Sequence, residues 1–396
     1  MKSDVPALAI IANSITPYRL HLHRRIVREV PQIRLLSVFT HEASNSPWTL
    51  EADAEISPAM FGSGDPSEGQ ARLQNALREW RKGGRITRWL GEHDVRAVIV
   101  GGYNDPGRLR IIRWCRRAGI PVFLWGDSNI HGDTVLGIRA AAKRLALGHV
   151  IGWCDGVMPC GSLGARYFQK YGAAADRIFL MPYEPDYELV RRIDAAAIAR
   201  VCRRFGLDRS RRRIVYSGRL VGIKRVDLLL DAFSRIAADR PGWDLLVIGG
   251  GELMAQLRAR VPERQGGDRI TWAGFIDDQA TVSALYRASD LLVLPSDREP
   301  WALVINEAAA AGLAIVASDV VGSAAELVRD GVNGRVFRRG DLEALVQCLA
   351  EVTSSPHRVD GMKAASEQVL EDWRRCADPV AGLRRALLFV NVIGPS

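Results

Sequence analysis

Two glutamates in this 396-residue sequence stand at a spacing that points directly to chemistry. Glu299 and Glu307 are eight residues apart, and between them a Glu-Pro turn leads into an alanine-rich helix expected over residues 302–311. We expect Pro300 to open this helix, because proline lacks the N–H that would be unpaired there anyway. Glu299 is then predicted at a helix N-terminus, which favours anions, with Glu307 one to two turns further on. This combination indicates a ligand that carries phosphate and hydroxyl groups, as a nucleotide sugar does.

A second segment, GRLVGIKRVD at 218–227, places two cations on one loop between a predicted strand and a helix predicted over 226–238. Arg219 offers a planar fork of donors and Lys224 a compact point charge, so together they suit a diphosphate. The alternative is ordinary surface charge, although a cation near a helix start opposes the helix dipole. The segment lacks the Gly-x-x-x-x-Gly-Lys-Ser/Thr order of a Walker A loop.

Glycine turns follow two more predicted strands. Gly249-Gly250-Gly251 comes directly after one strand, and Gly274-Phe275 ends another. Glycine allows the backbone to approach a phosphate or a base closely. A plain tight turn explains the three glycines equally well, and Phe275 can be read either as a base contact or as a packed aromatic.

Short apolar strands alternate with helical patterns along the chain, which predicts parallel sheets covered by helices on both faces. Twelve strands are too many for one comfortable sheet, so we expect an α/β protein with two doubly wound, Rossmann-like domains facing across a cleft. The expected boundaries give a first doubly wound domain over 1–185, a second over 186–375 and a helical C-terminal segment over 376–396. The polar segment 42–69 is expected to be an excursion loop.

The predicted strands are short and mostly apolar. They are Ala7–Ile11, Leu35–Phe39, Ala97–Val100, Val122–Trp125, Gly156–Met158, Ile178–Met181, Ile214–Ser217, Asp244–Ile248, Ile270–Ala273, Leu291–Leu294, Ala314–Ala317 and Gly334–Phe337.

Composition narrows the class of partner. The formal net charge of +9 indicates an anionic partner, either a nucleotide, a phospholipid surface or a nucleic acid. No nucleic-acid-binding module is recognisable, so no nucleic-acid partner is expected. The six cysteines show no Cys-x-x-Cys spacing and are expected to be buried and reduced, with no metal site. No apolar run is long enough to span a membrane, and we expect a cytoplasmic protein with peripheral contact at the inner face of the cell membrane as one alternative.

Several motifs in order resemble the group 1 glycosyltransferases (family 4), which have the GT-B architecture. The resemblance is carried by the Glu299-x7-Glu307 segment, GRLVGIKRVD, the glycine turn at 249–251, Ala273-Gly274-Phe275 and VVGSAAELVRDGVNGRVF at 320–337. It covers residues 156–345 well and the remainder more loosely. It implies a retaining, metal-independent hexosyltransferase that needs no cofactor and takes a nucleotide diphosphate sugar as donor. The implied acceptor is a glycan or a lipid-linked glycan in bacterial cell-surface polysaccharide or glycolipid synthesis. The resemblance also implies that domain 1–185 binds the acceptor, that domain 186–375 binds the nucleotide sugar and that a C-terminal helix at 376–396 crosses back to the first domain.

The resemblance also implies roles for the motif residues. Arg219 and Lys224 would hold the diphosphate and stabilise the charge that develops on it. Glu299 would act at the transferred sugar, and Glu307 would bind the ribose hydroxyls. Backbone and side-chain contacts to the donor are expected from Gly218, Gly250, Gly274, Phe275, Trp301, Ala302, Leu303 and Val304. Trp301 and Ala302 replace the more usual Phe and Gly of the family, so they are where we expect donor choice to be decided.

The first domain departs further from the family pattern. The usual glycine-rich opening loop is replaced here by a segment in which Thr16 can cap a helix and Pro17 can start it. Asp127 stands where the family has a catalytic-region histidine, and it is the candidate for polarising the acceptor hydroxyl or steadying the sugar. A turn residue that bonds its own backbone is the alternative for Asp127. The candidate acceptor contacts are Asn13, Tyr18, Arg19 and His131.

Two rival functions stay open at the level of sequence. One is another GT-B enzyme, such as a nucleotide-sugar epimerase or a phosphorylase. The other is a non-catalytic protein that binds a nucleotide sugar or a membrane. Titration with nucleoside diphosphates, combined with donor hydrolysis, separates these possibilities from a transferase.

Overall fold

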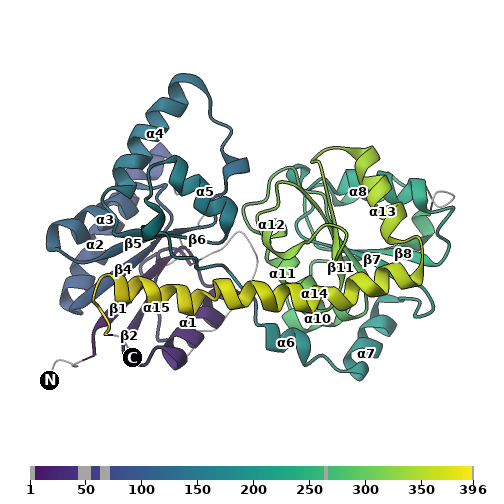
Figure 1. Ribbon diagram of the computed structural model, residues 1–396, viewed down its shortest axis with the longest axis horizontal. Helices are drawn as coiled ribbons and strands as arrows, with labels where there is room; N and C mark the ends of the chain where they lie inside the picture. Colours follow the sequence, from purple (N-terminus) through teal and green to yellow (C-terminus); the bar gives the residue numbers. More distant parts are fainter. Residues whose placement is uncertain (1–4, 43–54, 63–71, 263–265, 395–396) are drawn as a thin grey trace. The chain divides into compact units, whose positions relative to one another are not determined.

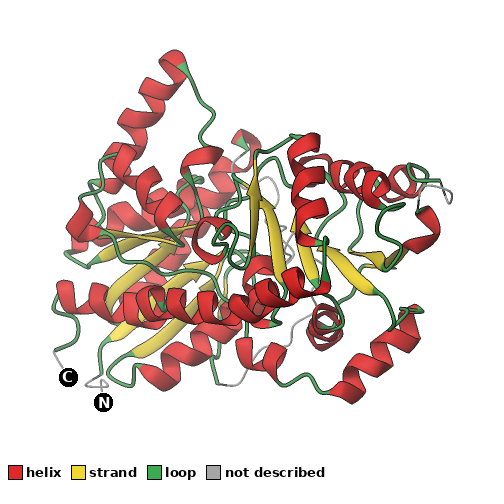
Figure 2. Cartoon of the chain, turned by 45° about the vertical axis from the view of Figure 1, so that its right-hand side comes forward, coloured by secondary structure: helices red, strands yellow, loops and turns green. Residues whose placement is uncertain are grey.

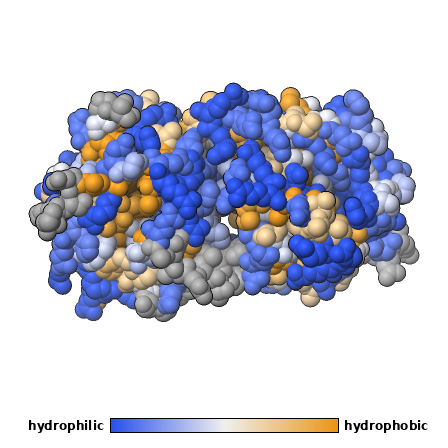
Figure 3. Space-filling model, turned by 90° about the horizontal axis from the view of Figure 1, so that it is seen from below, coloured by the Kyte–Doolittle hydropathy of each residue, from blue (hydrophilic) through white to orange (hydrophobic). Residues whose placement is uncertain are grey.

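The computed structural model describes residues 5–42, 55–62, 72–262 and 266–394, and the chain divides into two compact units (Figure 1). Unit 1 consists of Met1–Tyr183 together with Ala377–Ser396, and unit 2 of Glu184–Cys376. In each unit yellow strands form a sheet between red helices, as Figure 2 shows. Charged and polar side chains cover most of the face seen in Figure 3, where hydrophobic side chains appear in smaller patches.

The described residues of unit 1 form a parallel sheet in the order β3-β2-β1-β4-β5-β6. Its strands are β1 (Ala7–Ala12), β2 (Arg34–Phe39), β3 (Ala59–Met60), β4 (Val95–Gly101), β5 (Val122–Gly126) and β6 (Gly156–Pro159). Its α-helices are α1 (Pro17–Glu29), α2 (Ala76–Glu92), α3 (Pro106–Ala118), α4 (Gly137–Ile151), α5 (Ser162–Lys170) and α15 (Pro379–Phe389).

Alternation along β1 gives unit 1 two cores. Leu8 and Ile10 join a cluster with residues of α1 and α15, whereas Ala9 and Ile11 join a cluster on the other face with residues of α2 and α3. Side chains on a strand point alternately to opposite faces, so a central strand covered on both sides is apolar throughout. This is why β1 was recognisable as a short continuous apolar run.

The described residues of unit 2 form a second parallel sheet in the order β12-β11-β10-β7-β8-β9. Its strands are β7 (Arg212–Ser217), β8 (Trp243–Ile248), β9 (Ile270–Gly274), β10 (Leu291–Leu294), β11 (Ala314–Ser318) and β12 (Gly334–Phe337). Its α-helices are α6 (Tyr187–Arg191), α7 (Ala195–Phe205), α8 (Val226–Ile236), α9 (Met254–Arg258), α10 (Gln279–Arg287), α11 (Leu303–Ala310), α12 (Ala324–Leu327), α13 (Leu342–Val352) and α14 (Pro356–Ala377).

Both sheets have the same doubly wound strand order, in which the direction of winding reverses once. The reversal lies between β1 and β4 in unit 1 and between β7 and β10 in unit 2. Ligands of doubly wound sheets bind beyond the carboxyl ends of the strands at such a switch point. The topology therefore directs attention to the loops that follow these four strands.

The predicted α/β class is confirmed, and so are all the predicted strands except one. The segment Ile178–Met181 is not a strand of the sheet. It forms an isolated parallel bridge from Ile178 to Val157, and the N–H groups of Phe179 and Met181 each donate a 3.0 Å hydrogen bond to a carbonyl of β6. The sixth strand of the sheet is instead β3, which pairs with Val38 and Phe39 of β2 at the edge opposite β6. We missed β3 because it is two residues long and lies within the polar segment 42–69, of which residues 43–54 and 63–69 lie outside the described residues.

Candidate functional site

An ion pair spans the switch point of unit 2. Lys224 lies in the short 3₁₀ turn Gly222–Lys224 after β7, and its Nζ donates to the Glu299 carboxylate, which follows β10. Both side chains are mostly buried, at 17% and 12% exposure. The Ser296 hydroxyl donates a longer hydrogen bond of 3.4 Å to the same carboxylate oxygen. The sequence-predicted cation and carboxylate are thus neighbours although they are 75 residues apart.

The turn that carries Glu299 is held by the loop after β11. Glu299 forms an isolated parallel bridge with Val321, and its carbonyl accepts a 3.1 Å hydrogen bond from the Gly322 N–H. A Cβ on Gly322 would stand 2.0 Å from the Pro300 carbonyl oxygen, so only glycine fits this approach. The Ser323 hydroxyl donates to the Trp301 carbonyl at 2.6 Å. The position of Glu299 is therefore fixed by backbone contacts as well as by its ion pair.

The helix that follows Glu299 begins later than predicted. Pro300 does not open it, because α11 starts at Leu303 and Ala302 takes the N-cap position with a φ of +83°. A residue with a Cβ adopts such a conformation only at a steric cost. The change of direction at Ala302 leaves the N–H groups of Leu303 and Val304 in the first turn, where no helical carbonyl can accept them. These amides are among the donor contacts expected from the sequence, now placed in the first turn of α11.

Glu307 occupies the second turn of α11 and is partly buried. Its Oε1 accepts a 2.8 Å hydrogen bond from Nε2 of Gln279 at the start of α10. Burial raises the pKa of the Glu307 carboxyl to about 7, although the Tyr286 hydroxyl and the Gln279 amide both favour the ionised form. Glu307 is thus poised to gain or lose a proton near neutral pH, and sequence reasoning did not anticipate Gln279 or Tyr286.

Arg219 differs from Lys224 in its surroundings. Its side chain is exposed, and no carboxylate of the described residues forms an ion pair with it. Its carbonyl accepts a 3.0 Å hydrogen bond from the buried Tyr216 hydroxyl, which fixes the backbone that presents it. Of the two predicted cations, Arg219 is the one left available for an external anion.

The glycine turns prove to be places where two backbones approach each other. A Cβ on Gly249 would stand 1.9 Å from the Gly218 carbonyl oxygen, and one on Gly251 would stand 2.4 Å from the Leu220 carbonyl oxygen. Gly250 lies between them with more space, and its carbonyl accepts the Leu220 N–H at 2.9 Å. The turn after β8 is therefore packed directly on the loop that carries both predicted cations.

The remaining predicted donor residues are placed differently. Gly274 has a φ of +74°, and its carbonyl accepts the Gly249 N–H at 2.8 Å, while Phe275 beside it is 48% exposed. The Trp301 side chain is only 3% exposed, and its ring lies 6.2 Å from that of Trp373 in α14. A donor contact from Trp301 would have to come from its backbone, which weakens the expectation that its ring decides donor choice.

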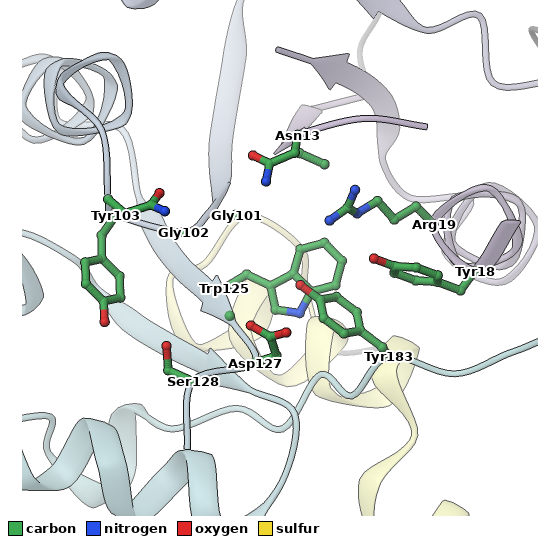
Figure 4. A pocket seen from close by; sticks show the side chains of 13 residues that line it. Asn13, Tyr18, Arg19, Gly101, Gly102, Tyr103, Trp125, Asp127, Ser128 and Tyr183 are labelled. Carbon is green, nitrogen blue, oxygen red and sulfur yellow. The ribbon is translucent and has the colours of Figure 1, made fainter. Parts of the chain in front are cut away.

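Unit 1 contains a pocket of ≈ 290 Å³ at its own switch point (Figure 4). It brings together four of the predicted residues, Asn13, Tyr18, Arg19 and Asp127, which come from the loop after β1, the start of α1 and the loop after β5. Their side chains surround one space in Figure 4. His131 does not line this pocket, and its side chain is exposed in the 3₁₀ turn Ile130–Gly132.

Aromatic rings form much of this pocket and were not predicted. Tyr183 lies between Tyr18 and Trp125, with ring centroids 5.1 Å and 5.0 Å away. The Trp125 indole N–H donates to the Met181 carbonyl at 2.9 Å, which fixes its ring. Arg19 lies against the Tyr18 ring at 5.3 Å and donates to the Ser14 carbonyl at 2.7 Å. The other lining residues that sequence reasoning missed are Ala12, Gly101, Gly102, Tyr103, Asn104, Gly126 and Ser128.

A usable signal for some of these residues was present in the sequence. Gly101-Gly102 directly follows the predicted strand at 97–100, and the switch-point rule applies to that strand end as much as to the others. Thr16, in contrast, was given a role that it does not have. It occupies the N-cap position of α1, but its hydroxyl is buried and bonds neither the helix nor any other described residue.

One wall of the pocket is supported by a buried arginine. Arg108 in α3 is 2% exposed, and its guanidinium donates to the Asp105 carboxylate, the Asn13 side-chain oxygen and, at 2.6 Å, the Gly101 carbonyl. It thereby ties the loops after β1 and β4 together. Among the described residues there is no group of three or more His, Cys, Asp and Glu side chains that could hold a metal ion.

The arrangement of unit 2 defines a class of protein. At the switch point of its doubly wound sheet, a lysine–glutamate pair, an exposed arginine and a helix start present cations and amide N–H groups that suit an anionic ligand. Residues 202–369 match the family profile described as glycosyl transferases group 1. The chain belongs to this family, which is also family 4 of the glycosyltransferases.

Relatives in sequence include enzymes named D-inositol 3-phosphate glycosyltransferase. The protein from Segniliparus rotundus is 31% identical over 234 residues, which cover 57% of this chain and 51% of the relative. The protein from Rhodococcus erythropolis is 30% identical over 280 residues, which cover 68% of this chain and 62% of the relative. The chain thus spans about half to three-fifths of the length of these curated relatives.

Solved structures extend the likeness over the whole chain. Anabaena HepE in complex with UDP and glucose has a TM-score of 0.71 at 16% identity and covers 98% of this chain and 100% of its own. Sucrose-phosphate synthase from Thermosynechococcus elongatus has a TM-score of 0.74 at 16% identity, with 97% and 100% covered. At this identity the likeness shows the fold, which is the GT-B fold with its two parallel six-stranded sheets.

Proposed function

We propose that this protein transfers a sugar from a nucleotide diphosphate sugar to an acceptor hydroxyl. The observation that carries the proposal is the convergence at the β7–β10 switch point of the Lys224–Glu299 pair, the exposed Arg219 and the first amides of α11. Cations and unpaired N–H groups at one site suit a diphosphate, and the carboxylate suits the hydroxyls or the developing positive charge of a sugar. The cations and N–H groups alone would indicate only the diphosphate of such a donor, and the carboxylate alone would indicate only its sugar.

In the proposed step, the bond between the anomeric carbon and the diphosphate oxygen breaks and a bond to the acceptor oxygen forms. The leaving diphosphate gains negative charge, which Arg219, Lys224 and the amides of Leu303 and Val304 stabilise. Attack on the face from which the diphosphate leaves retains the configuration of the sugar. The acceptor hydroxyl gives up its proton as the new bond forms, and on that face the leaving phosphate oxygen is the nearest base.

Glu307 has a separate role in this proposal. Its carboxylate accepts hydrogen bonds from the ribose hydroxyls, taking the place of the Gln279 amide or sharing with it. Because the pKa of the Glu307 carboxyl is about 7, the ionised form that accepts these hydrogen bonds becomes more populated as the pH rises through neutrality. Gly250, Gly274 and Phe275 are proposed to contact the base or ribose through backbone and ring, because they lie at or just beyond the carboxyl ends of the neighbouring strands β8 and β9.

The pocket of unit 1 is the proposed acceptor site. Asp127 is proposed to orient the acceptor hydroxyl, with Asn13, Tyr18 and Arg19 binding the rest of the acceptor. The rings of Tyr18, Trp125 and Tyr183 present apolar faces that suit the C–H face of a sugar ring. A glycan or lipid-linked glycan in cell-surface polysaccharide or glycolipid synthesis fits this lining. Solved relatives in structure include WaaG, a glycosyltransferase involved in lipopolysaccharide biosynthesis.

Calorimetric titration with UDP, GDP and ADP, followed by a screen of the corresponding nucleotide sugars for release of nucleoside diphosphate, tests the proposal. We expect one diphosphate to bind and its sugar derivative to be hydrolysed slowly without an acceptor. Lys224→Ala should weaken binding by about tenfold or more. Lys363→Ala is the matched control, because Lys363 pairs with Asp290 at 2.7 Å directly before β10, at the other end of that strand. Binding of a nucleotide sugar without any turnover would favour a non-catalytic binding protein instead.

A further inference from the structure

Helix α4 of unit 1 exposes large apolar side chains that no described part of the chain covers. Leu136, Ile138 and Leu145 are 83%, 90% and 79% exposed, the highest values among the large hydrophobic residues of the described chain. Figures 1 and 2 both show α4 extending away from the sheet of unit 1. Burial begins only near its C-terminal end, at Leu147, Val150 and Ile151.

The apolar residues form one stripe along the helix. Ile138 and Leu145 are seven residues apart, which places them on one face, and the exposed Ala141 and Ala142 lie between them on that face. Leu136 directly precedes the helix at its projecting end. Single exposed apolar residues are ordinary, but a contiguous stripe marks an interaction surface.

The opposite face of α4 is anchored to the body of unit 1. Lys143 donates to the buried Asp133 carboxylate at 2.8 Å, and its Nζ lies 5.1 Å from the ring centroids of both Tyr167 and Tyr171. Asp133 also accepts Lys170 of α5 at 2.6 Å. These partners hold the pKa of Asp133 at about 2, despite the opposing effect of its burial. The anchor fixes the rotation of α4 and so keeps the apolar stripe pointing outward.

Two arginines flank the stripe. At 100° per residue, Arg139 and Arg144 stand on either side of the face that carries Ile138 and Leu145. Both are exposed, and no carboxylate of the described residues forms an ion pair with either of them. Lys143, in contrast, is neutralised by Asp133. The free charge next to the stripe is therefore entirely positive.

We infer that this surface of α4 binds an anionic lipid bilayer. An apolar stripe bordered by arginines is the pattern of a helix that lies in the membrane interface, with its apolar residues among the acyl chains and its cations at the headgroups. A second copy of the chain is a poorer partner, because a symmetric contact would bring the arginines of one copy against those of the other. Among the described residues no helix is long and apolar enough to cross a membrane.

Co-sedimentation of the full chain with vesicles, without donor or acceptor, tests this inference apart from the proposed sugar transfer. We expect binding to vesicles that contain about one-third phosphatidylglycerol and much weaker binding to pure phosphatidylcholine, with a decrease as salt is added. Ile138→Ser/Leu145→Ser should reduce binding by about tenfold or more, because the apolar contact is lost. Arg139→Gln/Arg144→Gln should remove the preference for the anionic lipid.

Matched controls use residues of the same type elsewhere. Leu77→Ser alters a leucine that is 59% exposed on α2, and Arg200→Gln/Arg203→Gln alters two exposed arginines of α7. Both should bind vesicles as the wild type does, and all variants should keep the wild-type melting temperature. Equal binding by the α4 variants and the controls, or no binding to anionic vesicles, would overturn the inference. So would a dimer, detected by light scattering, that dissociates in Ile138→Ser/Leu145→Ser.

Discussion

Lys224 and Glu299 form a largely buried ion pair that joins the ends of β7 and β10, the two strands between which the sheet of unit 2 changes its direction of winding. Each side chain fixes the other, so the pair orients a cation and a carboxylate before any ligand arrives. A buried pair is costly to break from one side, because the remaining charge is left without a partner. The pair therefore links the stability of unit 2 to the geometry of the proposed donor site.

The pair should behave as one unit in donor binding. Lys224→Met and Glu299→Gln are each expected to weaken nucleotide-sugar binding, and the double variant should cost less than the sum of the two. We expect a coupling free energy of about 1–3 kcal/mol, since the residues are in direct contact. Calorimetric titration of the four proteins measures it. Strict additivity would show that the two side chains act independently on the donor.

Glu307 should make the stability of unit 2 depend on pH. Its pKa is raised from 4.5 to about 7, so between these values the folded chain holds a proton that the unfolded chain has lost. The stabilisation is complete below pH 4.5 and is lost as the pH rises through 7. Relative to the wild type, Glu307→Gln should therefore gain about 1–3 kcal/mol in the free energy of unfolding between pH 5 and pH 8.

Urea unfolding of the wild type and Glu307→Gln at both pH values measures this difference. Subtracting one protein from the other removes the contribution of every other titrating group. The affinity of the wild type for nucleoside diphosphate should also rise with pH as Glu307 ionises. In Glu307→Gln this rise should be absent. A constant stability difference between the two proteins would contradict the assigned environment of Glu307.

Ala302 should be replaceable by glycine with a gain in stability. At a φ of +83° its Cβ is strained, and glycine adopts this conformation without that cost. We expect Ala302→Gly to stabilise unit 2 by about 0.5–1 kcal/mol, since the relieved strain exceeds the added entropy of the unfolded chain. Thermal unfolding measures the change.

Ala364→Gly is the matched control for this substitution. Ala364 is exposed in the interior of α14, where glycine should destabilise by about 1 kcal/mol. Opposite signs for the two substitutions are the expected result. Equal destabilisation by both would mean that the turn before α11 relaxes and that Ala302 is not strained in solution.

Arg108 should be essential to the fold of unit 1 and not only to its pocket. Arg108→Met leaves the Asp105 carboxylate, itself 2% exposed, without its cation. We expect a loss of about 3–5 kcal/mol in the free energy of unfolding, measured with urea. Asp105→Asn in the same chain should restore part of it, because asparagine is neutral and still caps α3. A change of under about 0.5 kcal/mol in Arg108→Met would show that the buried network adds little.

Sequence reasoning reached the fold because its signals are local. Buried parallel strands such as Leu291–Leu294 are short apolar runs, and their alternation with helices fixes the class. The residues that follow such strands could also be named, which is how Arg219, Lys224 and Glu299 were found. The two-residue strand β3 carries no comparable signal, because it depends on pairing with β2 and not on its own composition.

What the sequence did not reveal depends on contacts between distant segments. The delayed start of α11 follows from Gly322 and Ser323, which hold the Pro300–Ala302 turn from the loop after β11. The burial of Trp301 depends in the same way on Trp373, 72 positions further along the chain. The aromatic pocket of unit 1 depends on Tyr183, which ends the first segment of that unit and is distant in the chain from Tyr18 and Trp125.

The most direct test of the proposed function is the rate at which nucleoside diphosphate is released from the preferred nucleotide sugar by the wild type, Glu299→Gln and Lys363→Ala. We predict that the wild type turns over the donor and that Lys363→Ala does so at a similar rate. Glu299→Gln should be slower by about 100- to 1,000-fold, as expected when charge stabilisation at the reacting carbon is removed. An unchanged rate in Glu299→Gln, or no release from any nucleotide sugar by the wild type, would contradict a glycosyl-transfer site at this switch point.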